Sequence, residues 1–313
     1  PDGSTKGEEE GKMRKAMGVD IGGTKVAAAI IDEQGHITHR VQVPSDTSSS
    51  EAMLECVVGV IDACLAEAEV EVSELTGIGL GIPGKVDSLN GVAIFQNNIP
   101  WEKFPVVARL ADCYAQVPIA IENDVKAAAY AEYRLAGMGP LDVFGYLTVS
   151  TGIACTNIVN HQIIRGDGFS GEIGFLPVPS STGLRPLESV CAGPGIEAMA
   201  RALYLDDRIT VAQVFARALK GEQIANELVD QSAMGVAIGL FAMICLLDPK
   251  EIVIGGSVAV KNPFYVERIK AVLERYAHKE QMHILPHIRV TDLGGDNGII
   301  GAGFLVMPAQ DIQ

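Results

Sequence analysis

Basic residues are scarce in this chain of 313 residues. Lysine and arginine together number 24, against 39 aspartates and glutamates, which gives a formal net charge of −15. A protein with this charge repels polyanions, so neither nucleic acid nor an anionic membrane surface is an expected partner.

Long apolar runs and paired cysteines are also missing. The apolar stretch from Gly235 to Leu247 stops at Asp248-Pro249 and predicts a buried core helix, not a membrane span. Residues 1–16 hold no apolar core, which argues against a signal peptide and predicts a disordered leader. The six cysteines lie far apart: Cys56, Cys64, Cys113, Cys155, Cys191 and Cys245. They predict neither a metal cluster nor a disulfide framework, and indicate reduced thiols in the cytoplasm.

Hydrophobic residues make up 48% of the chain, which suits two domains better than one.

The first apolar segment contains a glycine-rich break. The segment from Gly18 is interrupted by "GGTK" and resumes as "VAAAII", and a polar turn then precedes the alternating "HITHRVQV". The glycines therefore predict a turn between two strands. They do not open a helix, which excludes the dinucleotide and P-loop types of glycine-rich loop.

A similar pattern returns later in the chain. "FGYLTVSTGIACTNIVNHQIIRG" again predicts a strand, a Thr-Gly turn, a strand, a polar turn and a strand. Alternating helices and strands follow each copy, so we favour a duplicated α/β fold with a cleft between Asp20 and Glu172. Chance similarity of two glycine-bearing hairpins is the alternative, because the internal match is weak.

Paired turns of this kind suit the phosphates of a nucleotide. The backbone N–H groups of Gly22, Gly23 and Thr24 can approach an anion closely. Asp20 can reach Mg²⁺ through water, and Lys25 offers a positive charge. The alternative is an ordinary tight turn with a solvated lysine.

Six motifs in a fixed order carry a family resemblance: "DIGGTKVAAAIID", "GIGLGIPGKVD", "IENDVKAAAYAEY", "STGI", "GEIGF" and "IVIGGS". Together they resemble the ROK family of sugar kinases and sugar-responsive repressors. The resemblance implies a two-domain actin-like (ribonuclease H-like) ATPase fold with duplicated βββαβαβα halves and an interdomain cleft. The smaller domain is expected at 17–125 plus 299–313, and the larger at 126–298. A repressor needs a DNA-binding domain before the first motif, and residues 1–16 are too few for one.

The activity implied by the resemblance is transfer of the γ-phosphoryl group of ATP, with Mg²⁺, to a hydroxyl of a hexose or a derivative such as a glucoside. The 6-hydroxyl is the expected acceptor. Asp124 matches the family's catalytic aspartate, whose carboxylate accepts the hydroxyl proton. Without the resemblance, Asp124 is equally well explained as a helix N-cap. The family also implies a cytoplasmic homodimer.

The other site residues implied by the resemblance form two sets. The sugar-binding set is Asn98 (or Asn97 in the alternative register), Asn123, Asp124, Glu172 and Glu188. The ATP-binding set is Asp20, Gly22, Gly23, Thr24, Lys25, Thr151, Gly152, Gly255 and Gly256.

Two departures from the family pattern matter. Phe175 replaces a histidine that binds sugar and zinc, and the cysteines of the zinc segment are absent, so no zinc site is expected. Some zinc-less members phosphorylate glucosides.

Ala154, Cys155 and Thr156 replace three glycines of the downstream phosphate loop, where added Cβ atoms can cost affinity or rate. The alternatives are a kinase-impaired sugar- or nucleotide-binding protein and an unrelated ATPase of this fold, though the carboxylates favour a sugar acceptor.

Overall fold

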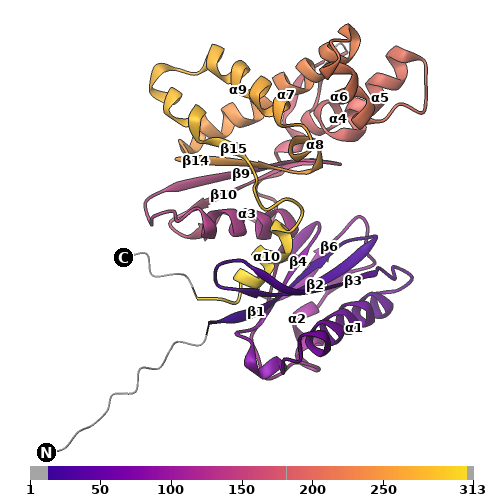
Figure 1. Cartoon of the computed structure of the whole chain (residues 1–313), viewed down its shortest axis with the longest axis vertical. Coiled ribbons are helices and arrows are strands. Elements are labelled where there is room, and N and C mark those ends of the chain that lie inside the picture. The colour runs from indigo at the N-terminus through magenta and orange to yellow at the C-terminus, as the bar shows by residue number, and fades with distance from the viewer. Residues whose placement is uncertain (1–12, 181, 309–313) are drawn as a thin grey trace, which may run out of the picture. The chain divides into compact units, whose positions relative to one another are not determined.

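The computed structural model describes residues 13–180 and 182–308, which form two compact units (Figure 1). The first unit runs to Glu122 and is completed by the chain from Ala302, and the second runs from Asn123 to Gly301. Most of the leader expected at residues 1–16 lies outside the described residues, and the first strand already begins at Lys15.

The first unit is built on a five-stranded sheet with the order β3-β2-β1-β4-β8. Its strands are β1 (Lys15–Ile21), β2 (Lys25–Asp32), β3 (Ile37–Pro44), β4 (Ile78–Ile82) and β8 (Ile119–Asn123). The first three form the predicted antiparallel meander, and β4 joins β1 in parallel. A separate small sheet contains β5 (Lys85–Asp87), β6 (Val92–Phe95) and β7 (Glu102–Phe104).

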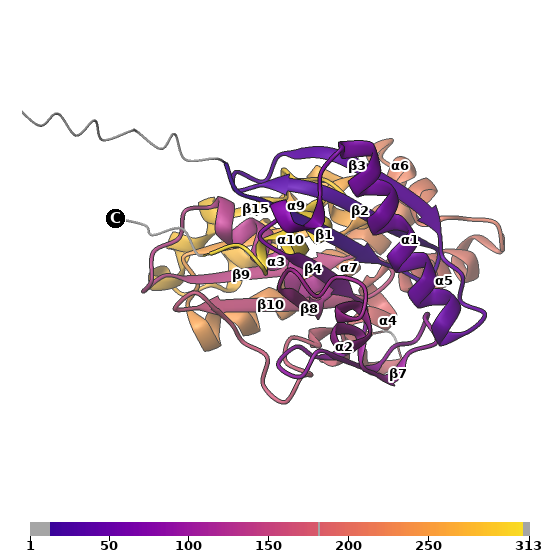
Figure 2. The ribbon, with the colours of Figure 1, turned by 90° about the horizontal axis from the view of Figure 1, so that it is seen from below.

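Residue patterns explain why these elements form. β2 is buried along its length after Lys25, as expected of a strand inside a sheet, whereas edge strand β3 alternates between half-buried and exposed residues. Helix α1 (Ser50–Ala68) packs on β2 and β3 (Figure 2). Its buried residues recur at helical spacing, and the Ser49 side chain caps its first turn by accepting a hydrogen bond from Ala52 N. Two further helices complete the unit: η1 (Val72–Glu74) and α2 (Val106–Ala111).

The second unit repeats this architecture. Its main sheet has the order β11-β10-β9-β14-β15. The strands are β9 (Val143–Val149), β10 (Ile153–Val159), β11 (Gln162–Ile163), β14 (Glu251–Gly255) and β15 (Ile288–Val290). Again three antiparallel strands come first, and β14 then joins β9 in parallel. The two sheets correspond strand for strand, which confirms the predicted duplication.

Helices cover both faces of the second sheet. Helix α3 (Asp124–Leu135) packs on β9 and β10 from one side, whereas α7 (Gln223–Leu247) and α9 (Pro263–Tyr276) lie on the other (Figure 1). Among the described residues, α7 alone is long and apolar enough to cross a membrane, but 61% of its most apolar window is buried in the protein core. It is the core helix predicted from the sequence.

The remaining elements of the second unit complete its outer layers. They are η2 (Ile173–Phe175), β12 (Pro177–Ser180), β13 (Gly183–Pro186), α4 (Leu187–Cys191), α5 (Gly193–Tyr204), α6 (Val211–Leu219), α8 (Ser257–Val260) and η3 (Lys279–His287). Helix α10 (Asn297–Phe304) follows β15 and contains the point at which the chain returns to the first unit.

Candidate active site

The residues singled out from the sequence fall into one group in each unit. The first unit holds Asp20, Gly22, Gly23, Thr24, Lys25, Asn97 and Asn98. The second unit holds Asn123, Asp124, Thr151, Gly152, Glu172, Glu188, Gly255 and Gly256.

In the first unit, the turn between β1 and β2 is closed by its own backbone. Gly22 N donates a hydrogen bond to Lys25 O at 2.9 Å, and the Ser45 hydroxyl donates to Gly22 O at 2.6 Å. A Cβ atom on Gly23 would lie 2.7 Å from the backbone oxygen of Asn98, so no larger residue fits there. Because Asn98 packs on Gly23, a predicted sugar-binding position and the predicted phosphate turn are neighbours within this unit.

In the second unit, the start of α3 settles which residue is the helix cap. The Asn123 side chain accepts a hydrogen bond from Lys126 N at 3.1 Å and is the N-cap. Asp124 is instead the first helical residue, and its Oδ1 accepts hydrogen bonds from Val125 N (2.9 Å) and Asn123 Nδ2 (3.0 Å). The alternative interpretation of Asp124 as an ordinary cap is therefore wrong, because Asn123 fills that role.

Three of the predicted carboxylates come together in the second unit. Burial raises the pKa of Asp124, and the charge of Glu172 raises it further against opposing hydrogen bonds from the backbone. Burial also raises the pKa of Glu172, with the nearby charge of Lys126 lowering it and that of Glu188 raising it. Glu188 Oε2 lies 3.2 Å from the position of a Cβ atom on Gly152, so this carboxylate borders the β9–β10 turn.

A tight backbone contact holds Glu172 in place. Cys155 N in β10 donates a hydrogen bond to Gly171 O at 2.7 Å. Gly171 has a φ of +95°, and a Cβ atom there would lie 1.9 Å from Cys155 O. Only glycine can adopt this φ and come this close to Cys155 O. Gly171 therefore holds the segment that contains Glu172 against the sheet.

The predicted nucleotide-binding turns of this unit also meet. The hydroxyls of Ser150 and Ser257 share a hydrogen bond at 3.1 Å, which joins the β9–β10 turn to the end of β14. Gly256 has a φ of +85°, and a Cβ atom on it would lie 2.4 Å from Val149 O. β9 and β14 are parallel and end here, and the carboxyl ends of parallel strands are where open α/β sheets bind ligands.

The residues that depart from the family glycines lie inside β10. Ala154, Cys155 and Thr156 pair with Thr148, Leu147 and Tyr146 of β9. Cys155 is 6% exposed and Thr156 is 1% exposed, whereas Ala154 is half-buried. The side chains of Cys155 and Thr156 therefore contribute to packing within the protein. The other departure, Phe175, is exposed and stacks on Phe169 with the ring centroids 6.0 Å apart.

Lys126 lies near the candidate site, although its sequence context did not single it out. It is 6% exposed, and its charge acts on both Glu172 and Cys155. Its signal was present in "NDVKAAA", where a lysine stands two residues after Asp124 at the start of a helix that is otherwise alanine-rich.

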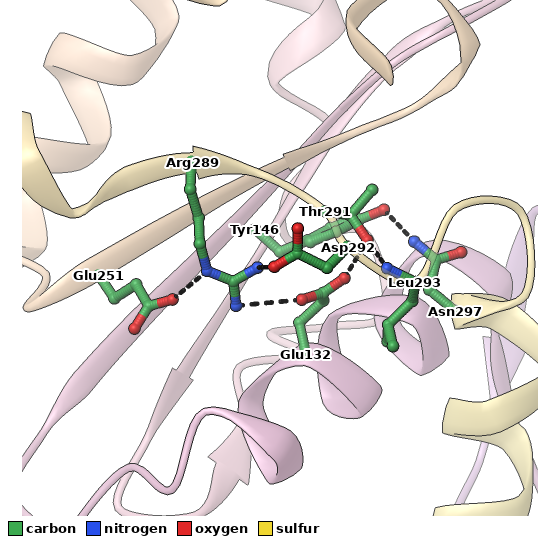
Figure 3. Close-up of polar contacts among 8 residues, drawn as sticks. All are labelled: Glu132, Tyr146, Glu251, Arg289, Thr291, Asp292, Leu293 and Asn297. Carbon is green, nitrogen blue, oxygen red and sulfur yellow. Dashed lines mark hydrogen bonds and ion pairs between the residues drawn. The ribbon is translucent and has the colours of Figure 1, made fainter. Parts of the chain in front are cut away.

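A polar network anchors the far end of α3 (Figure 3). Glu132 is 2% exposed and accepts hydrogen bonds from the Thr291 hydroxyl and from Arg289 Nη2, the latter at 3.2 Å. Arg289 also pairs through Nε with Glu251 at 2.7 Å and through Nη1 with Asp292 at 3.5 Å. The network ties the helix that begins with Asp124 to β14 and β15.

A separate hydrogen bond beside this network holds the start of α10. The Thr291 hydroxyl accepts a hydrogen bond from Leu293 N at 3.1 Å, and Asn297 Nδ2 donates to the Tyr146 hydroxyl at 2.8 Å (Figure 3). A Cβ atom on Gly255 would lie 2.0 Å from that hydroxyl, so Tyr146 also supports the turn at the end of β14.

This chain is similar to known proteins along nearly all of its length. The ROK family model matches residues 16–309. A glucokinase from Halalkalibacterium halodurans is 30% identical over 324 residues, covering 94% of this chain and 96% of the relative. An N-acetylmannosamine kinase from Haemophilus influenzae is 30% identical over 301 residues, with 93% and 95% covered.

Solved structures of ROK proteins are also similar to this chain along nearly all of its length. A ROK hexokinase from Thermus thermophilus superimposes with a TM-score of 0.79 at 32% identity, over 92% of this chain and 96% of that one. A ROK family glucokinase from Streptomyces griseus, in complex with glucose and AMPPNP, gives 0.73 at 27% identity, over 93% and 98%. With the family model matched along nearly all of its length, this chain belongs to the ROK family.

Proposed function

We propose that this protein transfers the γ-phosphoryl group of ATP to the 6-hydroxyl of a hexose or hexose derivative. It is an ATP-dependent sugar kinase, as its family and its full-length relatives indicate. The observation that carries the acceptor assignment is the grouping of Asp124, Glu172 and Glu188 beside the β9–β10 turn. Carboxylates accept hydroxyl hydrogen bonds at both oxygens, which suits a polyhydroxylated substrate.

Asp124 is the proposed general base. The hydrogen bonds from Val125 N and Asn123 Nδ2 both end on Oδ1, and we assign Oδ2 to the acceptor hydroxyl. Because phosphoryl transfer depends chiefly on positioning and charge stabilisation, a fixed carboxylate that takes the proton as the P–O bond forms suits the reaction. A raised pKa also makes this carboxylate a better base near neutral pH.

We assign contacts with the nucleotide to three glycine-containing turns, which are described for each unit separately. Gly22, Gly23 and Thr24 would hold phosphate oxygens in the first unit, with Lys25 nearby. Thr151-Gly152 and Gly255-Gly256 form the corresponding surface in the second unit. Asp20 is a half-buried carboxylate at the end of β1, and oxygen ligands of this kind suit Mg²⁺. When bound, Mg²⁺ neutralises charge on the phosphates.

A sugar panel tests the proposal. Glucose, N-acetylmannosamine and methyl and aryl β-glucosides should be offered with Mg-ATP, and ADP formation followed in a coupled assay. The relatives act on the first two, while the exposed ring of Phe175 motivates the glucosides. At least one sugar should raise ADP formation well above the sugar-free rate. Sugar binding without ADP formation on any member would favour the kinase-impaired alternative.

Glu172→Gln tests the acceptor contacts. Hydrogen bonds to a charged group contribute about 1.5–3 kcal/mol, so KM for the sugar should rise roughly tenfold to a hundredfold while kcat falls less. Glu227→Gln, an exposed change on α7 of the same unit, should leave KM unchanged. An unaltered KM in Glu172→Gln would remove this residue from the site.

The acid side of the pH profile tests the environment of Asp124. A base must be ionised, so kcat should fall as pH falls through its pKa. Because burial and Glu172 raise that pKa, the loss should begin above the ordinary aspartate value of 3.8. We expect kcat, measured from about pH 4 to about pH 8, to decline already in mildly acidic solution. A rate that stays flat until the ordinary carboxylate range would contradict the assignment.

A further inference from the structure

Two serine hydroxyls meet where β9 and β14 end. Ser150 directly follows β9, Ser257 is the first residue of α8, and their Oγ atoms lie 3.1 Å apart. The two residues are 107 positions apart in the chain, so it is the parallel pairing of the strands that brings them together. They join the β9–β10 turn to the turn after β14, and neither is among the site residues expected from the sequence.

The backbone around this pair of serines is fixed. Gly256 has a φ of +85°, and a Cβ atom on it would lie 2.4 Å from Val149 O, so glycine is needed where the two strand ends come together. Ser150 N donates a hydrogen bond to Gly152 O at 3.0 Å, and Ser150 O accepts one from Gly193 N at 2.8 Å. Because the backbone groups of Ser150 are paired within the protein, its hydroxyl is the group that it can offer to a ligand.

The number of hydroxyl hydrogens determines what the pair can donate. Each serine hydroxyl has one hydrogen, and the bond between Ser150 and Ser257 uses one of the two. Among the described residues, neither hydroxyl has a second hydrogen-bond partner. Ser150 is half-buried and Ser257 is exposed, so a ligand can reach the pair. The pair therefore presents one free donor at the carboxyl ends of two parallel strands.

We propose that the Ser150–Ser257 hydroxyl pair donates a hydrogen bond to a phosphate oxygen of the nucleotide. The phosphates carry all of the negative charge of a nucleotide, and a hydrogen bond to an ionised acceptor is roughly twice as strong as one between neutral groups. The bond between the two hydroxyls also polarises the one that donates, because adjoining hydrogen bonds strengthen one another. The inference rests on the proposed function, in which the turns after β9 and β14 contact the nucleotide.

Equilibrium binding of nucleotides tests the proposal. Ser150→Ala/Ser257→Ala removes both hydroxyls and should raise Kd for Mg-ATP, measured by calorimetry, roughly tenfold or more. Kd for adenosine, measured by ligand-observed NMR, should stay the same because adenosine has no phosphate. An unchanged Kd for Mg-ATP would overturn the proposal. An equal rise in Kd for adenosine would also overturn it, since the hydroxyls would then serve the nucleoside.

Two controls accompany the double variant. Both serines lie outside the hydrophobic core, so the alanine variants should fold with Tm near the wild-type value. Ser73→Ala makes the same substitution at an exposed serine of η1 and should leave Kd for Mg-ATP unchanged. A rise in Kd for Ser73→Ala as large as that of the double variant would contradict a specific role for the pair.

The two single variants test whether the hydroxyls act as one unit. If each serine contacted the nucleotide independently, the fold losses of Ser150→Ala and Ser257→Ala would multiply in the double variant. Because the two hydroxyls are bonded and share one free donor, the loss in the double variant should differ from that product by about twofold or more. Losses that simply multiply would overturn the shared donor.

Nucleotide binding does not require turnover, so the two proposals fail separately. Wild-type protein that binds Mg-ATP but forms no ADP with any sugar would overturn the kinase assignment, whatever the serine variants do. An active wild-type enzyme whose double variant binds Mg-ATP as tightly would overturn only the role of the serines. Wild-type protein that binds no Mg-ATP would overturn both.

Discussion

Asp124→Asn should lower kcat by roughly 10²–10⁴-fold, the usual contribution of a general base. Asparagine has the same shape and keeps the hydrogen bond that Val125 N donates, but it cannot accept a proton. Asn123 remains the N-cap, so α3 should still begin at the same residue. Sugar affinity by calorimetry and Tm should therefore stay near the wild-type values.

Two controls separate chemistry from structure at this position. Asp207→Asn makes the same substitution at an exposed site of the second unit and should leave kcat unchanged. Asn123→Ala removes the cap and should cost about 1 kcal/mol of stability. Near-normal kcat in folded Asp124→Asn would rule out Asp124 as the base.

Of the substitutions proposed, Glu132→Ala should lower the free energy of unfolding the most, by about 3 kcal/mol. The substitution removes the buried acceptor of both the Thr291 hydroxyl and Arg289 Nη2. Thr291 is 5% exposed, so its hydroxyl would lose its partner away from water. Because Glu132 ties α3 to β15, kcat should fall as well, through the position of Asp124. Urea unfolding and steady-state kinetics measure the two effects.

Two further substitutions serve as controls for Glu132→Ala. Glu274→Ala on exposed α9 surface should change stability by less than about 0.5 kcal/mol. Glu132→Gln keeps an acceptor oxygen for Thr291 and should cost less than the alanine variant. If Glu132→Ala is as stable as Glu274→Ala, the network does not anchor α3.

The hairpins and the duplication could be predicted because their signals are local. In β1 and β2, apolar runs bracket a Gly-Gly turn, and the same pattern recurs in β9 and β10. The register of a strand decides which side chains are buried, so it was the structure that placed Cys155 and Thr156 inside the protein. The sequence showed only that they replaced glycines.

The parts that escaped prediction depend on distant partners. Glu132 and Thr291 are separated by 159 positions, and no local pattern pairs them. The short helix α4, which carries Glu188, was not predicted because five residues give too little periodicity. Lys126 resembles any exposed helix lysine until its burial beside the carboxylates is known.

The most direct test of phosphoryl transfer to a sugar hydroxyl is ³¹P NMR of wild-type protein with Mg-ATP and the sugar that the panel identifies. ADP and a new phosphomonoester should appear together, with the phosphorus coupled to the two protons on C6 of the sugar. Inorganic phosphate without a phosphomonoester, or coupling of the phosphorus to a proton elsewhere on the ring, would contradict it.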